Sequence, residues 1–466
     1  MLTLLAEQQE CLWDEALPIE VRELPEDLAA LDRLLADPAV LGPIVERFRR
    51  EVIEERRAVL TDGRPTIAME TYVRLMVLKQ RYRWGYRSLM AEVSDSIHLR
   101  RFCRISLSER VPDDSTVRKL TRRIGPDTVN EITRVLIVQA TRSKRFRPRA
   151  VRIDSTVIEA DVKYPTDSGL AADGVKVLAR EGRKLAALVK EKKRRVRDRS
   201  RSMGRTLRAV TRTIRRRSGE AKAEVLKLTA RTGELLEESI AETRRLVVIA
   251  RRRARGRGAR AKLKAAAQLE QLADRCEKVV SQIKQRVAGE PIKDRLVSIS
   301  DPDARPIRKG KLGKPNEFGY VNQLCEVTEN TRRGARGLIL PPTTQIGNPA
   351  EDTLLPDTIA ELTRLGIAPK EIALDGGFNV GPTRQTLEDH GLEPDRVFIS
   401  GRQQPGSKRT QRRLQRYRTG AEGRISHLKR GYGMDRSRLK GDEGQQIWNG
   451  WAILAYNADT LVVRER

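Results

Sequence analysis

The sequence predicts an α/β protein: a mixed α/β core, an α-helical N-terminal region before it, and a long helical insertion within it. Three observations lead to this prediction. Apolar residues recur at helical spacing through the first 148 residues, and a β-branched segment of alternating polarity begins at Arg149. Short strand-like and helix-like segments alternate after Pro291, as expected of one mixed core. Between these parts lies a proline-free segment rich in Ala, Leu, Lys, Arg and Glu.

The N-terminal region, residues 1–148, contains several short amphipathic segments. Helices are expected at 25–36, 66–84, 88–93 and 98–102, and another should begin near Pro112 and continue through Ile124. Asp113, Asp114 and Ser115 are candidate N-caps for that last helix. Its outward face carries the candidate DNA-binding residues Arg118, Lys119, Arg122 and Arg123. A helix-turn-helix-like DNA-binding domain and an ordinary small helical bundle both fit this pattern.

The core should begin with a strand at 149–164 and resume after the insertion. Strands are expected at 295–300, 318–329, 337–344, 371–378 and 396–400, with helices at 352–366 and 382–391 and a helical C-terminal part from Gln411 to Leu461. The predicted core domain therefore comprises residues 149–177 and 291–466.

The insertion, residues 178–290, holds most of the positive charge. The segment from Arg180 to Glu290 has 34 Lys/Arg against 13 Asp/Glu, a net charge of +21 out of +30 for the whole chain. Its apolar residues predict long coiled-coil-like helices, for example an antiparallel hairpin, with a break at Gly256 and Gly258. This charge indicates either a surface that neutralises DNA phosphates or a solvated charged arm.

Composition also limits the class of protein. A net charge of +30 is unusual for a metabolic enzyme and indicates a polyanionic partner, most simply nucleic acid. No apolar run approaches the roughly 18 residues that a membrane span requires, and the acidic N-terminal stretch is unlike a signal peptide, so a cytoplasmic protein without a membrane partner is expected. The four cysteines lie far apart, which predicts free thiols.

Three acidic residues stand out by their positions. Asp154 lies in the first core strand, and Asp375 ends an apolar strand just before two glycines. Glu422 shares one helix face with Arg418 and Lys429, which are candidates to bind DNA phosphates or to orient Glu422. Carboxylates from separate elements can together hold the two divalent metal ions used in phosphodiester cleavage. Each acid taken alone could equally be a turn cap or a surface ion-pair residue.

These residues resemble a known family. Arg418, Glu422 and Lys429 match the R-x-x-x-E-x-x-x-x-x-x-K signature of bacterial insertion-sequence transposases of the DDE type. Residues 154–170 and the DGGF sequence at 375–378 are similar to the blocks around the first and second catalytic Asp of that family, and 66–103 is similar to its N-terminal helical domain. The signature has a Tyr three residues before its Arg, where this chain has Gln415, so no role is carried over to the neighbouring Tyr417.

The resemblance implies a ribonuclease-H-like core in which Asp154, Asp375 and Glu422 are the catalytic, metal-binding triad. It further implies Mg²⁺ as cofactor, with Mn²⁺ as a substitute, and duplex DNA as partner, both terminal inverted repeats and target DNA. A homodimer or higher oligomer on DNA, associated with the bacterial nucleoid, would be expected. Two other functions fit the sequence: a non-catalytic regulatory or architectural DNA-binding protein, and a ribonuclease-H-like nuclease without strand transfer.

Overall fold

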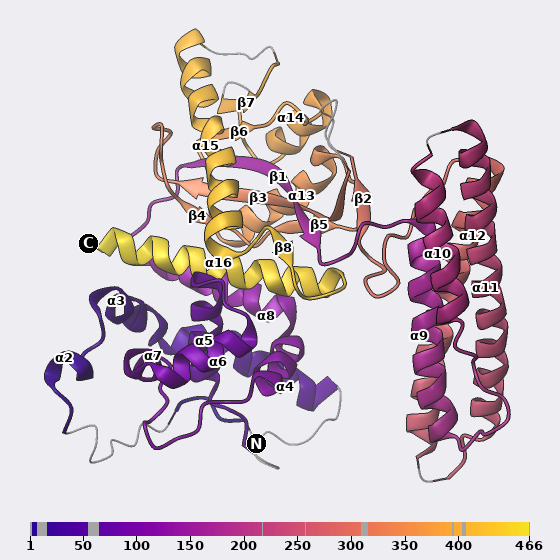
Figure 1. Ribbon diagram of the computed structural model, residues 1–466. Helices are drawn as coiled ribbons and strands as arrows, with labels where there is room; N and C mark the ends of the chain where they lie inside the picture. Colours follow the sequence, from indigo (N-terminus) through magenta and orange to yellow (C-terminus); the bar gives the residue numbers. More distant parts are fainter. Residues whose placement is uncertain are drawn as a thin grey trace. The chain divides into compact units, whose positions relative to one another are not determined.

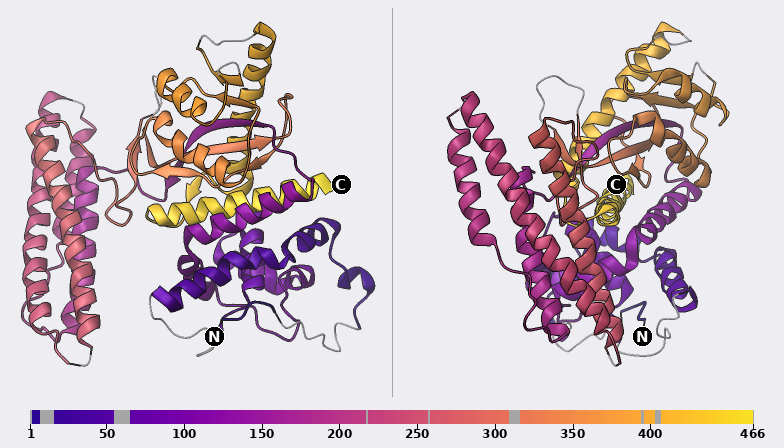
Figure 2. Two further views of the ribbon diagram at one scale, coloured as in Figure 1. Left: turned by 180° about the vertical axis from the view of Figure 1, so that it is seen from behind. Right: turned by 90° about the vertical axis from the view of Figure 1, so that its right-hand side faces the viewer.

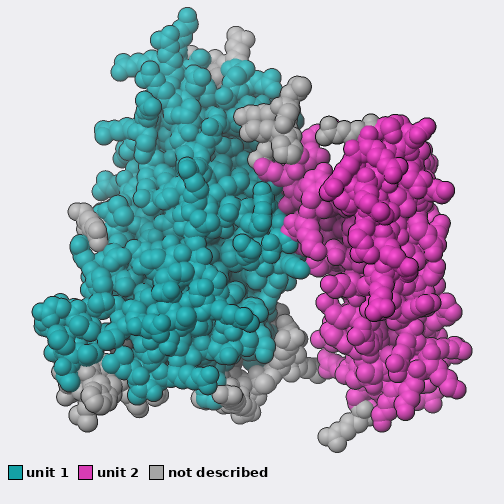
Figure 3. All heavy atoms as spheres, in the orientation of Figure 1, with its two compact units in different colours: residues 1–161, 319–466 teal, residues 162–318 magenta. Residues whose placement is uncertain are grey.

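The chain divides into two compact units, each described separately below. Unit 1 comprises residues 1–161 and 319–466, and unit 2 comprises residues 162–318 (Figure 3). The computed structural model describes residues 2–6, 16–54, 65–216, 218–256, 258–308, 316–393, 396–402 and 407–465. The predicted mixed α/β class is confirmed, because unit 1 combines helices with a mixed sheet (Figure 1).

The first part of unit 1 is helical, as predicted. Its helices are α2 (Ile19–Arg22), α3 (Glu26–Leu35), η1 (Pro38–Leu41), α4 (Gly42–Glu54), α5 (Met69–Arg81), α6 (Tyr86–Asp95), α7 (Ile97–Phe102) and α8 (Asp114–Arg142). The predicted cap is present, since the Asp113 carboxylate accepts a hydrogen bond from Ser115 N at 2.8 Å. Helix α8 is kinked where Gly125 takes a φ of +77° immediately before Pro126.

The sheet of unit 1 is built around one long strand. In this unit the order β3-β1-β6-β7 joins β1 (Ala150–Ala160), β3 (Glu317–Thr328), β6 (Glu371–Leu374) and β7 (Val397–Ile399). Strand β3 is antiparallel to β1, whereas β6 is parallel to β1 and β7 to β6. The short strands β4 (Leu338–Ile339) and β5 (Thr343–Gln345) pair with β3, and β8 (Arg436–Ser437) pairs with β1.

Alternate residues of the sheet pack against different helices. Val151 and Ile153 belong to the main core, together with residues of α13 (Glu351–Arg364), α14 (Val380–Glu388) and α16 (Asp442–Glu465). Ala150, Ala373 and Phe398 instead pack against α15 (Lys408–Tyr432). Because side chains alternate between the faces of a strand, Asp154 and Asp375 project toward the face that carries α15.

The N-terminal helices and the sheet share one hydrophobic core. Helix α16 lies alongside α8 and beneath the sheet in the views of Figures 1 and 2. Its Trp451 is fully buried and meets the edge of Tyr72 on α5, with the ring centroids 5.6 Å apart. The predicted domains 1–148 and 149–177 with 291–466 therefore contribute, within residues 1–161 and 319–466, to a single compact unit.

Unit 2 is a helical bundle with its own core. Its helices are α9 (Asp167–Leu188), α10 (Ser200–Ile214), α11 (Gly219–Arg252) and α12 (Ala259–Ala288), and strand β2 (Arg305–Ile307) follows them. The four helices lie side by side in Figures 1 and 2. The predicted break between long helices is present at Gly256 and Gly258, which both have positive φ. The unit extends beyond the predicted 178–290, because α9 begins at Asp167 and buried residues after α12 complete the core.

Two strand predictions were wrong. Residues 295–300 form no strand, because Leu296 N bonds to the Gln282 side chain on α12 at 2.6 Å while Leu296 and Ile299 pack into the bundle. Residues 337–344 do not form one continuous strand. Pro341 and Pro342 cannot donate hydrogen bonds to a sheet, so β4 ends before them and β5 begins after them.

Two further expectations concern the whole sequence. Cys103, Cys276 and Cys325 are buried free thiols, as predicted, and Cys11 lies outside the described residues. Among the helices that the structure describes, none is both long enough and apolar enough to cross a membrane.

Candidate active site

Strands β1 and β6 bring Asp154 and Asp375 together. The parallel register pairs Ile153 with Leu374, and the two aspartates are the next residue on each strand path. Both acids consequently leave neighbouring strands on the same face of the sheet. Asp154 is largely buried, whereas the Asp375 side chain is 39% exposed.

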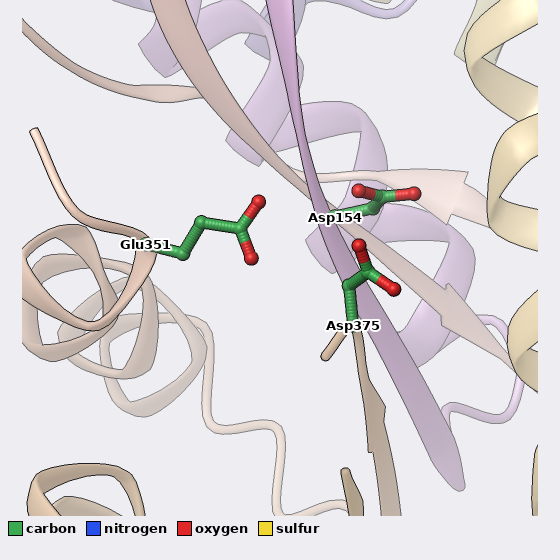
Figure 4. Close-up of side chains that lie close together, drawn as sticks. All are labelled: Asp154, Glu351 and Asp375. Carbon is green, nitrogen blue, oxygen red and sulfur yellow. The ribbon is translucent and has the colours of Figure 1, made fainter. Parts of the chain in front are cut away.

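A third carboxylate joins them from α13. Glu351 is the first residue of that helix, and its side chain points toward the two aspartates in Figure 4. One oxygen from each of Asp154, Glu351 and Asp375 lies within 4.8 Å of the others. The start of α13 is held against β3, because Gln323 Nε2 donates to the Glu351 carbonyl at 2.8 Å. Glu351 was not among the residues singled out from the sequence.

Gly377 makes room for this third carboxylate. A Cβ atom at Gly377 would lie 2.6 Å from Glu351 Oε2 and 2.9 Å from its Cδ. No real side chain tolerates such a contact without displacement, so the glycine after β6 allows Glu351 to approach the backbone there. This function of the second glycine in the DGGF sequence concerns side-chain space rather than backbone conformation, because its φ is not in the left-handed region.

Arg418 is the cation of the site. Its Nη1 lies 2.7 Å from Asp375 Oδ1 and 3.9 Å from Asp154 Oδ2, and its Nη2 donates to Glu422 Oε1 at 3.0 Å. Glu422 thus reaches the two aspartates through the arginine, and its own side chain is 69% exposed. Three of the sequence-predicted residues, Arg418, Asp154 and Asp375, are in mutual contact, and Glu422 lies at the solvent side of them.

Helix α15 is fixed to β1 by a buried arginine. Arg152, two residues before Asp154, donates from Nε to Glu326 at 2.7 Å and from Nη1 to the Tyr417 carbonyl at 2.9 Å. A Cβ at Gly420 would overlap this guanidinium at 1.9 Å, so α15 can approach only because that residue is glycine. The contact sets the position of Arg418 relative to Asp154.

Lys429 and Tyr417 also hold α15 in place. Lys429 Nζ donates to the Val157 carbonyl of β1 at 2.8 Å. Tyr417 is fully buried and its hydroxyl lies 2.7 Å from Thr328 Oγ1. Both residues of the signature region therefore have a structural role in attaching the helix to the sheet.

The three carboxylates of Asp154, Glu351 and Asp375 have too few neighbouring positive charges to balance their own. Burial, with a further contribution from Asp375, raises the pKa of Asp154 to about 6. Burial, with further contributions from Asp154 and Asp375, raises the pKa of Glu351 to about 7. Glu351 Oε2 is buried and has no hydrogen-bond partner among the described residues. Uncompensated hard oxygen donors of this kind fit a divalent cation such as Mg²⁺.

Of the six basic residues predicted to bind DNA, Arg418 and Lys429 lie on α15 as described above, and the other four lie on the exposed face of α8. Arg118 pairs with Asp114, and Arg122 donates to the Lys440 carbonyl at 3.0 Å. Arg123 pairs with the buried Glu51 at 2.7 Å, and Lys119 is exposed. Lys119 and Arg123 line a hollow of about 620 Å³ with Arg110. Arg118 and Arg123 are therefore partly neutralised by carboxylates.

Comparison with known families gives one result. Residues 28–123 match the family described as Transposase domain (DUF772). The match supports a transposase. It covers the helical segment from α3 to Arg123 in the first third of α8, and this segment precedes Asp154, Glu351, Asp375 and Glu422. No curated protein and no solved structure matches the chain.

Proposed function

We propose that this protein is a transposase of the DDE type with a ribonuclease-H-like core. It would bind duplex DNA at the ends of its mobile element, hydrolyse a phosphodiester bond there and transfer the 3′-OH to target DNA. The observation that carries the proposal is the meeting of Asp154 and Asp375 at adjacent parallel strands with Arg418 and Glu422 of one helix, in a chain that also contains a transposase domain.

In this proposal the carboxylates bind metal and Arg418 positions them. Asp154, Asp375 and Glu422 would hold Mg²⁺ (or Mn²⁺), and Glu351 would add a fourth carboxylate. Bound divalent metal would activate the attacking oxygen and stabilise the leaving oxygen. Arg418 would keep the carboxylates close together before metal binds, because its guanidinium contacts three of them.

DNA is the partner that the charge and the family match favour. The chain has an excess of 30 positive charges, and transposases act on DNA. Arg118, Lys119, Arg122 and Arg123 of α8 would contact the phosphate backbone of the element ends. A protein complex that joins two ends would contain at least two copies of this chain.

The test is cleavage of a labelled DNA fragment that carries the element's own ends. We expect wild type to nick it with Mg²⁺ or Mn²⁺ and not with EDTA. Asp375→Ala should lower the rate by at least about 100-fold, since a metal ligand is lost, while DNA binding is retained. Joining of the cut end to a second DNA would identify a transposase. Nicking without joining would identify a nuclease, and binding without nicking would leave a regulatory or architectural protein.

A further inference from the structure

Helix α10 of unit 2 carries a continuous stripe of arginines. Arg201, Arg205, Arg208, Arg212 and Arg215 follow steps of four, three, four and three residues, which places them on one helix face. All five are exposed, as is Arg216. The helix contains no Asp or Glu, and none occurs from Arg199 to Gly219. Along the axis the stripe extends for about 21 Å, at about 1.5 Å per residue.

Several other basic residues of the bundle are paired with carboxylates. Arg199, just before α10, bonds to Glu238 and Glu242 at 2.8 Å each. Arg244 on α11 contacts Asp274 and Glu277 on α12 at 2.6 and 2.8 Å. Arg231, Arg251, Arg253, Lys278, Lys284 and Arg286 also have carboxylate partners. Within the described residues of unit 2, no ion pair reaches the arginines of α10.

The opposite side of α10 faces the bundle. Met203 is buried in the bundle core, and Leu207 packs against that core. Thr213 is buried near the end of the helix. The helix is thus held against the bundle through Met203 and Leu207 with its arginines outward, and Ile214 at its end is 60% exposed.

We infer that the arginine face of α10 binds the phosphate backbone of duplex DNA. B-form DNA has one negative charge per about 1.7 Å of axis, so a 21 Å stripe spans about a dozen phosphates. Exposed guanidinium groups without carboxylate partners are free to replace the counterions of those phosphates. This inference deepens the proposed function, because it names a surface by which the transposase holds DNA independently of sequence.

The test compares two fourfold variants of the full-length protein. One is Arg201→Gln, Arg205→Gln, Arg208→Gln and Arg212→Gln, which changes only the stripe. The matched control is Arg231→Gln, Arg244→Gln, Arg251→Gln and Lys284→Gln, which removes the same charge from ion-paired positions in the same bundle. Circular dichroism should show equal helix content for both, since glutamine is a good helix former.

Affinity for a duplex of unrelated sequence is measured in EDTA over a range of salt concentrations. The slope of log affinity against log salt should become shallower by about 3 to 4 in the α10 variant, near 0.9 for each phosphate that is no longer neutralised. The control variant should change the slope much less. Because no metal is present, the result does not depend on whether the protein cleaves DNA, so this inference and the proposed catalysis can fail separately.

Two results would overturn the inference. Equal slopes for the α10 variant and the control would mean that overall charge, not this helix face, determines binding. An α10 variant that keeps its DNA affinity but no longer binds vesicles of phosphatidylglycerol and phosphatidylcholine would assign the stripe to an anionic membrane surface instead.

Discussion

At the scale of single residues, Arg418 partly neutralises a cluster of four acidic residues, Asp154, Glu351, Asp375 and Glu422. Its guanidinium is 2.7 Å from Asp375, 3.9 Å from Asp154 and 3.0 Å from Glu422. Glu351 has no such partner for Oε2, and its pKa is raised to about 7 by burial and by the neighbouring aspartates. Of the four acids, Glu351 therefore has the most to gain in energy from a cation at the site.

The two glutamates should differ in how their loss affects catalysis. Glu351→Gln should raise the Mg²⁺ concentration for half-maximal nicking by about tenfold or more, because it removes a carboxylate facing the two aspartates. Glu422→Gln should instead lower the maximal rate at saturating Mg²⁺, as expected of a triad residue. Mg²⁺ titrations of the nicking rate check both expectations.

Asp357→Asn is the matched control for Glu351→Gln. Asp357 is exposed on the same helix α13, and it is not part of the carboxylate group. If Glu351→Gln shows the same Mg²⁺ dependence as Asp357→Asn, then Glu351 does not contribute to metal binding.

Asp154 and Asp375 could be predicted from the sequence, whereas Glu351 could not. Asp154 and Asp375 were singled out because Asp154 lies within the first core strand and Asp375 ends an apolar strand just before two glycines. Sites in α/β proteins commonly form at the carboxyl ends of strands. Glu351 has no such pattern around it, since an acid in the first turn of a helix is common and stabilises the helix dipole. Its approach to the aspartates arises from the tertiary packing of α13, which no local spacing encodes.

At the scale of elements, strand β6 positions Asp375, and the turn after it leaves space for Glu351. Gly377 leaves the space that the Glu351 carboxylate occupies, since a Cβ there would come within 2.6 Å of Oε2. Gly377→Ala should displace Glu351 and lower metal-dependent nicking by about tenfold, with the secondary structure unchanged. Nicking rates at fixed Mg²⁺, together with circular dichroism, check this expectation.

Gly381→Ala is the control for that turn. Gly381 lies four residues further along, in α14, and a Cβ there meets no atom within 4 Å. Replacing a helical glycine by alanine should leave nicking unchanged and stabilise the fold slightly. Equal nicking rates for the two alanine variants would contradict the role assigned to Gly377.

Helices and strands were predicted well where one physical rule dominates. The alternation of β1 and the capped start of α8 are local patterns, and both are present. Residues 295–300 have the composition of a strand, yet their backbone bonds to the Gln282 side chain instead of a neighbouring strand. Composition identified a buried segment there, and the bundle determined its conformation.

At the scale of the whole molecule, unit 2 is inserted between two adjacent antiparallel strands. The register pairs Ile158 with Tyr320 and Glu159 with Gly319, so β1 and β3 would form a hairpin if the bundle were absent. Replacing residues 161–317 by Asn-Gly, a favoured two-residue hairpin turn, should therefore give a folded, shorter protein. It should keep metal-dependent nicking and lose much of its DNA affinity at moderate salt.

Thermal unfolding and nicking of this shortened chain check the expectation. Asp375→Ala in the same background controls for cleavage by contaminants. A shortened chain that does not fold would show that unit 1 depends on unit 2 for its stability.

The β1–β3 register also has a consequence for the order of folding. Glu159 and Gly319 are 160 positions apart (319 − 159), although they are neighbours in the sheet. Closing an unstructured loop of that length costs about 3 kcal/mol more entropy than closing one of four residues. The helices of unit 2 have local contacts and should form quickly, and they emerge from the ribosome before β3. We expect the bundle to fold first, so that the strand synthesised earliest acquires its antiparallel partner only after the intervening chain is already compact.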